Sequence, residues 1–293
     1  MQFYIVDVFA EKKYAGNQLA VVRGAESLST DEMQTIALEM NYSETTFILR
    51  DESRDGGYDV RIFTPVHEVP FAGHPTLGTA FVIQQEIMGE PVEQITLNLK
   101  VGQIPVSISY RDDQPSELWM HQRPPSFGPT FEPEALAAAL NLEINDFDTR
   151  FPIQDVSTGL PFVLVPLQSL SAIKRCRVNQ EKFDHFIKNS ERAKAVFIFC
   201  PEPYSAENDL NARMFAPHFN VNEDPATGSA NGCLAGYLVK HRYFGSDRID
   251  VRVEQGYEIN RPSLLKLRAQ PKGDDIDVFV GGQVVKVAEG RLI

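Results

Sequence analysis

The sequence is poor in cysteine and has neither a long hydrophobic run nor a basic cluster. Its three cysteines, Cys176, Cys200 and Cys233, are too few and too scattered for a disulfide framework or a zinc site. The longest apolar run, Leu160 to Leu167, is far shorter than the roughly 20 residues of a membrane-spanning helix. Acidic residues outnumber basic ones by 40 to 28, and the resulting net charge of -12 repels polyphosphate. We therefore expect no metal, membrane or nucleic-acid partner.

Motifs that mark common cofactor sites are also absent. The chain has no GxGxxG of a dinucleotide site, no GxxxxGK[ST] of a P-loop and no HExxH of a zinc protease. The N-terminal MQFYIVDVF lacks the pattern of a signal peptide, which favours a first strand and a cytoplasmic protein. An acidic protein can still bind a small anion where backbone N–H groups converge at a helix N-terminus.

The most informative feature that is present is an internal repeat. Arg61-Ile62-Phe63-Thr64-Pro65 and the turn FAGHPTLG return 152 residues later as Arg213-Met214-Phe215-Ala216-Pro217 and EDPATGSANG. Two further landmarks keep nearly this spacing: Phe47-Ile48 matches Phe197-Ile198, and Gly102 matches Gly256. The sequence therefore predicts two duplicated halves with a small-molecule site in the cleft between them.

Each glycine-rich turn precedes a helix that has almost no polar face, at 76–84 and at 227–240. Such helices must be enclosed by other structure, and the runs around them are typical of strands. We expect an α+β fold of two pseudo-symmetric domains, each a mostly antiparallel, barrel-like sheet wrapped around a central helix. Pro124-Pro125 and Gly128-Pro129 mark the expected linker. The expected domains are 1–123, completed by a last strand at about 284–293, and 124–283.

Two residues of the first half are candidates for proton transfer. Glu44 precedes an apolar strand, where partial burial would raise its pKa toward neutrality and let it take and return a proton. His74 lies directly before a helix, next to Gly73. The alternatives are a solvated loop glutamate and a structural histidine, and both stay open at this point.

The second half offers an anion site. Asp224 stands just before the turn, and Thr227, Gly228 and Ser229 have N–H groups free to point outward at the helix start. Such a nest binds carboxylates. The alternative interpretation is that Asp224 and Thr227 only cap the helix.

Four ordered segments resemble the phenazine-biosynthesis PhzF-like isomerases, which share the diaminopimelate epimerase fold. They are GNQLAVV (16–22), YSETTFI (42–48), RIFTPVHEVPFAGHPTLG (61–78) and RMFAPHFNVNEDPATGSANG (213–232). The resemblance runs over nearly the full length. It implies that Glu44 is the catalytic acid/base and that Ser43, Gly73, His74, Asp224, Gly228 and Ser229 bind substrate. It implies neither a cofactor nor a metal.

The chain departs from the parent fold in one decisive respect. Diaminopimelate epimerases and proline racemases use two facing cysteines at the starts of the two central helices. Here those places hold Gly73-His74-Pro75 and Asp224-Pro225, while Cys233 lies later in its helix as a small buried hydrophobe. Racemisation by two thiols is therefore not expected. Gln18, where the family usually has proline, puts little in doubt.

The resulting hypothesis is a cofactor-independent isomerase that moves a proton on a small cyclic or unsaturated carboxylic acid, similar to dihydro-hydroxyanthranilate. Glu44 would act as general acid/base in the cleft. The alternatives are a lyase or hydrolase acting on a different small acid, and a non-catalytic metabolite-binding protein. A homodimer is the expected assembly, with the anionic substrate as the small-molecule partner.

Overall fold

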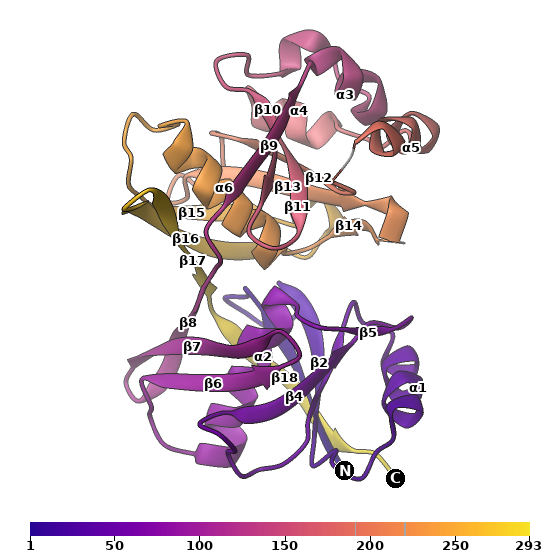
Figure 1. The fold of residues 1–293 in the computed structure, drawn as a ribbon, viewed down its shortest axis with the longest axis vertical. Coiled ribbons are helices and arrows are strands. Elements are labelled where there is room, and N and C mark those ends of the chain that lie inside the picture. The colour runs from indigo at the N-terminus through magenta and orange to yellow at the C-terminus, as the bar shows by residue number, and fades with distance from the viewer. Residues whose placement is uncertain (191, 220) are drawn as a thin grey trace. The chain divides into compact units, whose positions relative to one another are not determined.

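The computed structural model describes residues 1–190, 192–219 and 221–293, with the side chain of residue 189 left out. The chain divides into two compact units (Figure 1), Met1–His121 with Gly281–Ile293, and Gln122–Val280. Each unit is described by itself, and the assignment of independent domains from the sequence stays a prediction.

The first unit is a sheet with one enclosed helix. The hairpin β1–β2 is antiparallel, β2 runs parallel to β3, and β4 pairs antiparallel with β3 and parallel with β6. β18 returns to pair with β1, and both chain ends lie in this unit (Figure 1). The elements are β1 (Gln2–Val8), β2 (Asn17–Arg23), α1 (Thr30–Met40), β3 (Thr45–Ile48), β4 (Tyr58–Phe63), β5 (Glu68–Val69), α2 (Gly73–Ile83), the π-helix η1 (Gln84–Met88), β6 (Gln94–Leu99), β7 (Gly102–Arg111), β8 (Gln114–His121) and β18 (Val284–Arg291).

The second unit repeats this order of pairings. β10–β11 is an antiparallel hairpin, β11 runs parallel to β12, and β13 pairs antiparallel with β12 and parallel with β15. The elements are β9 (Ser126–Phe131), α3 (Pro133–Leu140), η2 (Ile144–Asp146), β10 (Ile153–Ser157), β11 (Pro161–Pro166), α4 (Leu170–Arg175), α5 (Gln180–Asn189), β12 (Val196–Cys200), β13 (Leu210–Ala216), η3 (Pro217–Phe219), β14 (Val221–Asp224), α6 (Gly228–Lys240), β15 (Ile249–Gln255), η4 (Tyr257–Ile259), β16 (Ser263–Lys272) and β17 (Asp275–Gly282), which ends in the first unit.

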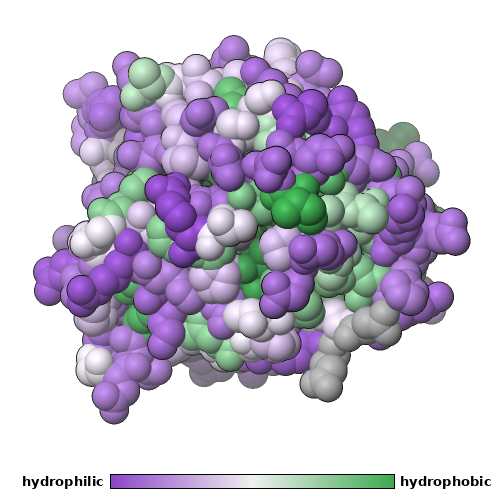
Figure 2. Space-filling model, turned by 90° about the horizontal axis from the view of Figure 1, so that it is seen from above, coloured by the Kyte–Doolittle hydropathy of each residue, from purple (hydrophilic) through white to green (hydrophobic). Residues whose placement is uncertain are grey.

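The two central helices are enclosed, as their apolar sequences require. Every residue of α2 except Gly73 is buried, and α2 contacts β1, β2, β3, β6, β7, β8 and β18. In α6 all residues but Ser229 and Lys240 are buried, against β10, β11, β15 and β16. Glycine makes this close packing possible: a Cβ on Gly78 would lie 2.6 Å from Leu19 Cδ2. The outer surface of the face seen in Figure 2, by contrast, is mostly hydrophilic.

Strand register corrects one detail of the repeat. Phe47 stands opposite Arg61, but Arg213 stands opposite Ile198 and not Phe197. The sequence match of Phe47 to Phe197 is therefore wrong by one residue, because equivalent positions must face the same side of the sheet. With the register fixed by the arginines, the position of Glu44 in the second half is held by Ala195. The scaffold is repeated, but the glutamate is not.

The arginine that defines the repeat has the same contacts in both units. Arg61 donates from Nε and Nη2 to both carboxylate oxygens of Glu68, at 2.8 and 2.7 Å. Arg213 donates to Glu223 in the same way, at 2.9 and 2.8 Å. Each guanidinium also lies over the ring of the phenylalanine two residues later, with distances to the ring centroid of 5.0 Å for Arg61 and 4.9 Å for Arg213. These bidentate pairs fasten the short strands β5 and β14 to their neighbours.

The segment expected as a linker is partly a strand. Gly128-Pro129 lies within β9, which pairs with β10. Gly128-Pro129 was expected outside a strand, because proline usually interrupts a sheet. Here the register shifts between Gln154 and Val156, so Pro129 falls at a bulge, where a missing N–H is tolerated.

The two arginines differ in burial, with side chains 6% exposed for Arg213 and 23% exposed for Arg61, which predicts unequal stability losses. Arg213→Met would leave the carboxylate of Glu223, whose side chain is only 9% exposed, without its charge partner. We expect a loss of about 3–5 kcal/mol in the free energy of unfolding. Arg61→Met should cost about 1 kcal/mol, because Glu68 keeps Lys100 at 2.6 Å and Arg61 is partly exposed. Urea unfolding of both variants measures the difference, and equal losses would contradict this account.

Candidate active site

The candidate residues of the first unit meet at the start of α2. Glu44 comes directly before β3, and His74 is in the first turn of α2. His74 Nε2 lies 3.4 Å from Glu44 Oε2, with the two side chains 8% and 19% exposed. Thr79 Oγ1 donates to Thr46 Oγ1 at 2.8 Å and so fixes the helix against the strand that follows Glu44. Ser43 is exposed beside this pair, and Gly73 is half-buried.

His74 is a neutral imidazole at neutral pH. Burial lowers the pKa of His74 from 6.5 to about 3, although a hydrogen bond with the backbone of Gln18 opposes this effect. Nε2 has no hydrogen bond among the described residues, so the bond with Gln18 uses Nδ1. A neutral ring that donates through Nδ1 carries a lone pair on Nε2. That lone pair faces Glu44, where it can accept a hydrogen bond once the carboxyl group is protonated.

The candidate residues of the second unit lie around the start of α6. Asp224 ends β14, Thr227 is the N-cap, and Gly228 and Ser229 form the first turn. The side chain of Thr227 makes no capping hydrogen bond. Its hydroxyl donates instead to Asp224 Oδ2. The alternative interpretation, in which Asp224 and Thr227 only cap the helix, is therefore wrong in one respect: the side chain of Thr227 forms no capping bond. First-turn amides have no acceptor within the helix, which makes this end suitable for an anion.

Sequence reasoning missed Gln255, the last residue of β15. Its side chain is fully buried and contacts the segment that carries Asp224. Nε2 donates to the Asp224 carbonyl at 2.9 Å and to Thr227 Oγ1 at 3.1 Å. Oε1 accepts from Thr227 N at 3.2 Å and from Asn231 Nδ2 at 2.9 Å. The only signal in the sequence is a pair of polar residues, Glu254 and Gln255, that end an otherwise alternating strand before a glycine.

The structure thus brings the predicted residues together in two sets, one in each unit. Glu44, Ser43, Gly73 and His74 form the first set, and Asp224, Gly228 and Ser229 form the second. The cleft expected between the halves stays a prediction.

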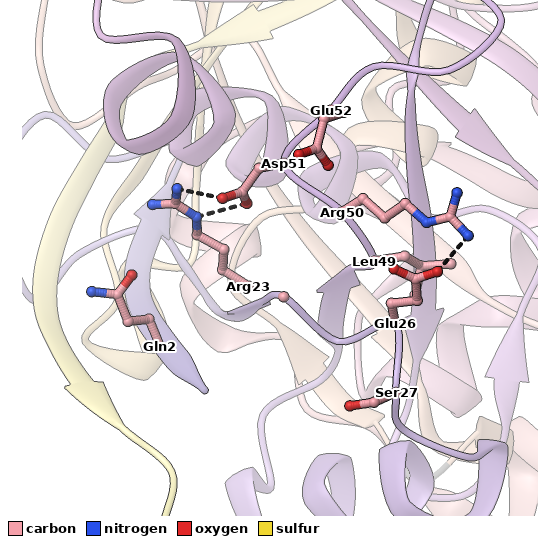
Figure 3. A pocket seen from close by; sticks show the side chains of 9 residues that line it. Gln2, Arg23, Glu26, Ser27, Leu49, Arg50, Asp51 and Glu52 are labelled. Atoms are coloured by element: carbon pink, nitrogen blue, oxygen red, sulfur yellow. Dashed lines mark hydrogen bonds and ion pairs between the residues drawn. The ribbon is translucent and has the colours of Figure 1, made fainter.

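A surface hollow of about 590 Å³ contains none of these residues (Figure 3). Arg23 and Asp51 point toward each other in it, with a bidentate contact of 2.8 and 2.7 Å. Arg50 is paired with Glu26 in the same hollow. Because its cations are already neutralised by carboxylates, this hollow is a weaker candidate than the start of α2.

The described residues contain no group of three or more His, Cys, Asp or Glu side chains placed to hold a metal ion. No helix in the described part of the chain is long and apolar enough to span a membrane.

Comparison with known proteins identifies the family. The family model for phenazine biosynthesis-like proteins, PhzC-PhzF, matches residues 6–290. The chain belongs to this family. A relative from Pseudomonas aeruginosa named trans-2,3-dihydro-3-hydroxyanthranilate isomerase is 35% identical over 291 residues, which cover 99% of this chain and 98% of the relative. A second protein of that name, from Pseudomonas chlororaphis, is 34% identical over 294 residues, 99% of each chain. The chain is accordingly an isomerase of the PhzF family.

Solved structures confirm the expected fold class. The PhzF-family protein of Bacillus anthracis superposes with a TM-score of 0.91 at 28% identity, covering 100% of this chain and 99% of the other. A probable proline racemase from Agrobacterium radiobacter superposes with a TM-score of 0.64 at 10% identity, covering 100% of this chain and 92% of that one. The second likeness shows the fold alone. This PhzF-family isomerase therefore has the α+β, epimerase-like fold that its sequence predicts.

The glycine after Gln255 gives a test of how tightly this region is packed. Gly256 has φ +79°, and a Cβ there would lie 2.4 Å from the Arg261 carbonyl oxygen and 2.6 Å from that of Pro225. We expect Gly256→Ala to destabilise the protein by more than about 2 kcal/mol, since backbone cannot yield easily. Gly245→Ala is the matched control, with φ +74° but open space around the Cβ. It should cost only about 1 kcal/mol in thermal or urea unfolding, and equal losses would show that packing plays no part.

The low pKa of His74 predicts a loss of stability in acid. The unfolded chain binds this proton below pH 6.5, whereas the folded chain binds it only near pH 3. Stability therefore falls as the pH drops from 6.5 toward 3, by about 1.4 kcal/mol per pH unit for one proton. His74→Asn should remove this contribution and flatten the dependence. Urea unfolding at several pH values measures it, and parallel curves for the two proteins would contradict the assignment.

Proposed function

We propose that the chain is a cofactor-independent isomerase that moves a proton on a small cyclic, unsaturated carboxylic acid of the dihydro-hydroxyanthranilate type, with Glu44 as general acid/base. The observation that carries this proposal is the pairing of Glu44 Oε2 with the lone-pair nitrogen of a buried, neutral His74 at 3.4 Å. The name of the relative from Pseudomonas aeruginosa supports the choice of substrate class.

The chemistry needs only one carboxyl group. Glu44 as carboxylate takes a proton from a carbon of the substrate, and the electron pair of that C–H bond is delocalised over the conjugated system and the acid's own carboxyl group. The protonated Glu44 then returns the proton to a conjugated carbon, so the double bonds move and no atom is lost. His74 accepts a hydrogen bond from the protonated carboxyl group and holds it in place between the two steps.

The remaining candidates bind and orient the acid in this proposal. Gly228 and Ser229 offer first-turn amides of α6 to the substrate carboxylate, with Asp224 beside them. Ser43 and Gly73 border the Glu44–His74 pair from the loop and from the helix start. Ala195, the counterpart of Glu44 in the second unit, has no proton to exchange. Glu44 alone is therefore expected to carry out both steps, the removal of the proton and its return.

The lyase, hydrolase and non-catalytic alternatives make different predictions. A lyase or hydrolase would change the mass of the acid, whereas an isomerase leaves it unchanged and a binding protein leaves the acid unaltered. Mass spectrometry of the mixture, read together with its proton NMR spectrum, separates these outcomes. The homodimer is also kept as a proposal, for which light scattering should give twice the 32.9 kDa of the chain.

Replacing Glu44 tests the proposal directly. The protein is incubated in heavy water with trans-2,3-dihydro-3-hydroxyanthranilate, and double-bond migration and deuterium incorporation are followed by NMR. We expect Glu44→Gln to slow both by 10²-fold to 10⁴-fold, the usual contribution of a general acid/base. Glu52→Gln, an exposed glutamate of the same unit, is the control and should match the unsubstituted protein. Undiminished exchange in Glu44→Gln would rule out the assigned role.

A further inference from the structure

Gln255 uses its entire hydrogen-bonding capacity on the segment that begins α6. Its two amide protons are donated to the Asp224 carbonyl and to Thr227 Oγ1, and its carbonyl accepts from Thr227 N and Asn231 Nδ2. A side-chain amide has two donors and two acceptor sites, so none is left over. The orientation of the amide is fixed as well, because the Thr227 N–H can only donate and must face the Gln255 oxygen.

This orientation sets the direction of the next hydrogen bond. Thr227 Oγ1 accepts from Gln255 Nε2 at 3.1 Å, and its one proton is directed to Asp224 Oδ2. Oδ2 of Asp224 is therefore held as a hydrogen-bond acceptor by this directed series of hydrogen bonds. Gln255 is fully buried, and Asp224 and Thr227 are 8% and 9% exposed, so water competes little with these bonds.

Comparison of the two units shows that the hydrogen-bond chain from Gln255 through Thr227 to Asp224 is not part of the scaffold that both units share. Matching the strand pairs β4–β6 and β13–β15 by register places Leu99 where the second unit has Gln255. The preceding pair does keep its polar character, as Asn98 donates to Asp59 at 2.9 Å and Asn211 donates to Glu254 at 3.3 Å. A fold that can be built with leucine at this position has glutamine only in the unit that carries Asp224.

We infer that Gln255 is a positioning residue for the reaction, which acts through Thr227 to fix the orientation and the acceptor state of Asp224 at the start of α6. The inference rests on the proposed function, in which Asp224 orients the bound acid. Gln255 itself is fully buried and acts only through the residues it holds.

The test compares variants that keep volume and remove hydrogen bonds. Gln255→Met and Thr227→Val each break this hydrogen-bond chain with little change in side-chain volume. Thr227→Ser keeps the hydroxyl group and therefore the hydrogen bonds. Leu265→Ala, in the neighbouring strand β16, is a buried substitution that lowers stability without touching the chain. Turnover of trans-2,3-dihydro-3-hydroxyanthranilate is measured well below each variant's midpoint of unfolding.

We expect Gln255→Met and Thr227→Val each to lower kcat/KM at least tenfold. Thr227→Ser and Leu265→Ala should stay within threefold of the unsubstituted protein. The double variant Gln255→Met with Thr227→Val should have a kcat/KM no more than about threefold below that of the less active single variant, because both substitutions break the same hydrogen-bond chain. Activity within threefold in Gln255→Met, or losses that multiply in the double variant, would overturn the inference.

A crystal structure of Gln255→Met gives a readout that needs no substrate. We expect the Asp224 carboxylate to be reoriented and the Thr227 hydroxyl to be turned away from it, while β14 and α6 keep their positions. If the unsubstituted protein does not turn over the acid, the proposed substrate is wrong. The crystal structure of Gln255→Met then tests the positioning role of Gln255 by itself. A carboxylate in its original orientation would then refute the positioning role.

Discussion

The structure depends on the enclosure of two helices that have no polar face. An apolar helix can be removed from water only if strands cover it on all sides, and in each unit a sheet does this around α2 or α6. The same enclosure fixes the position of the helix start. Because first-turn amides have no partner within the helix, a buried helix offers a polar end at a fixed place in an apolar interior. Candidate residues for binding and catalysis gather at these two helix starts.

Duplication supplied two such ends, and the side chains around them then diverged. The bidentate pairs of Arg61 with Glu68 and of Arg213 with Glu223 have nearly the same geometry in the two units. Around the first helix start stand a carboxyl group and a neutral imidazole. Around the second stands a carboxylate held by a threonine and a glutamine. The first set is suited to moving a proton and the second to holding an acid in a fixed orientation.

Burial decides the chemistry of the first set. An exposed histidine would be partly protonated near neutral pH and would form an ion pair with Glu44, which would keep the glutamate ionised. Inside the unit, desolvation lowers the pKa of His74 far enough to keep the ring neutral. A neutral ring tolerates both protonation states of the carboxyl group. A residue that must take a proton and return it needs this kind of neighbour.

The sequence alone determined the repeat, the two enclosed helices, most strands and the family, because these rest on local patterns of hydrophobicity, glycine and motif spacing. It also named Glu44, His74 and Asp224. It misjudged Gly128-Pro129, because only the pairing of β9 with β10 reveals a bulge that accepts the proline.

Tertiary structure decided what depends on neighbours distant in sequence. The register of β12 against β13 showed that Ala195 holds the position of Glu44 in the second unit. The burial of α2 set the charge of His74, and the end of β15 brought Gln255 to Asp224 from 31 residues away. Contacts of this kind leave no periodic trace in a sequence. Buried polar side chains satisfy one another across the fold, and only the fold shows which ones meet.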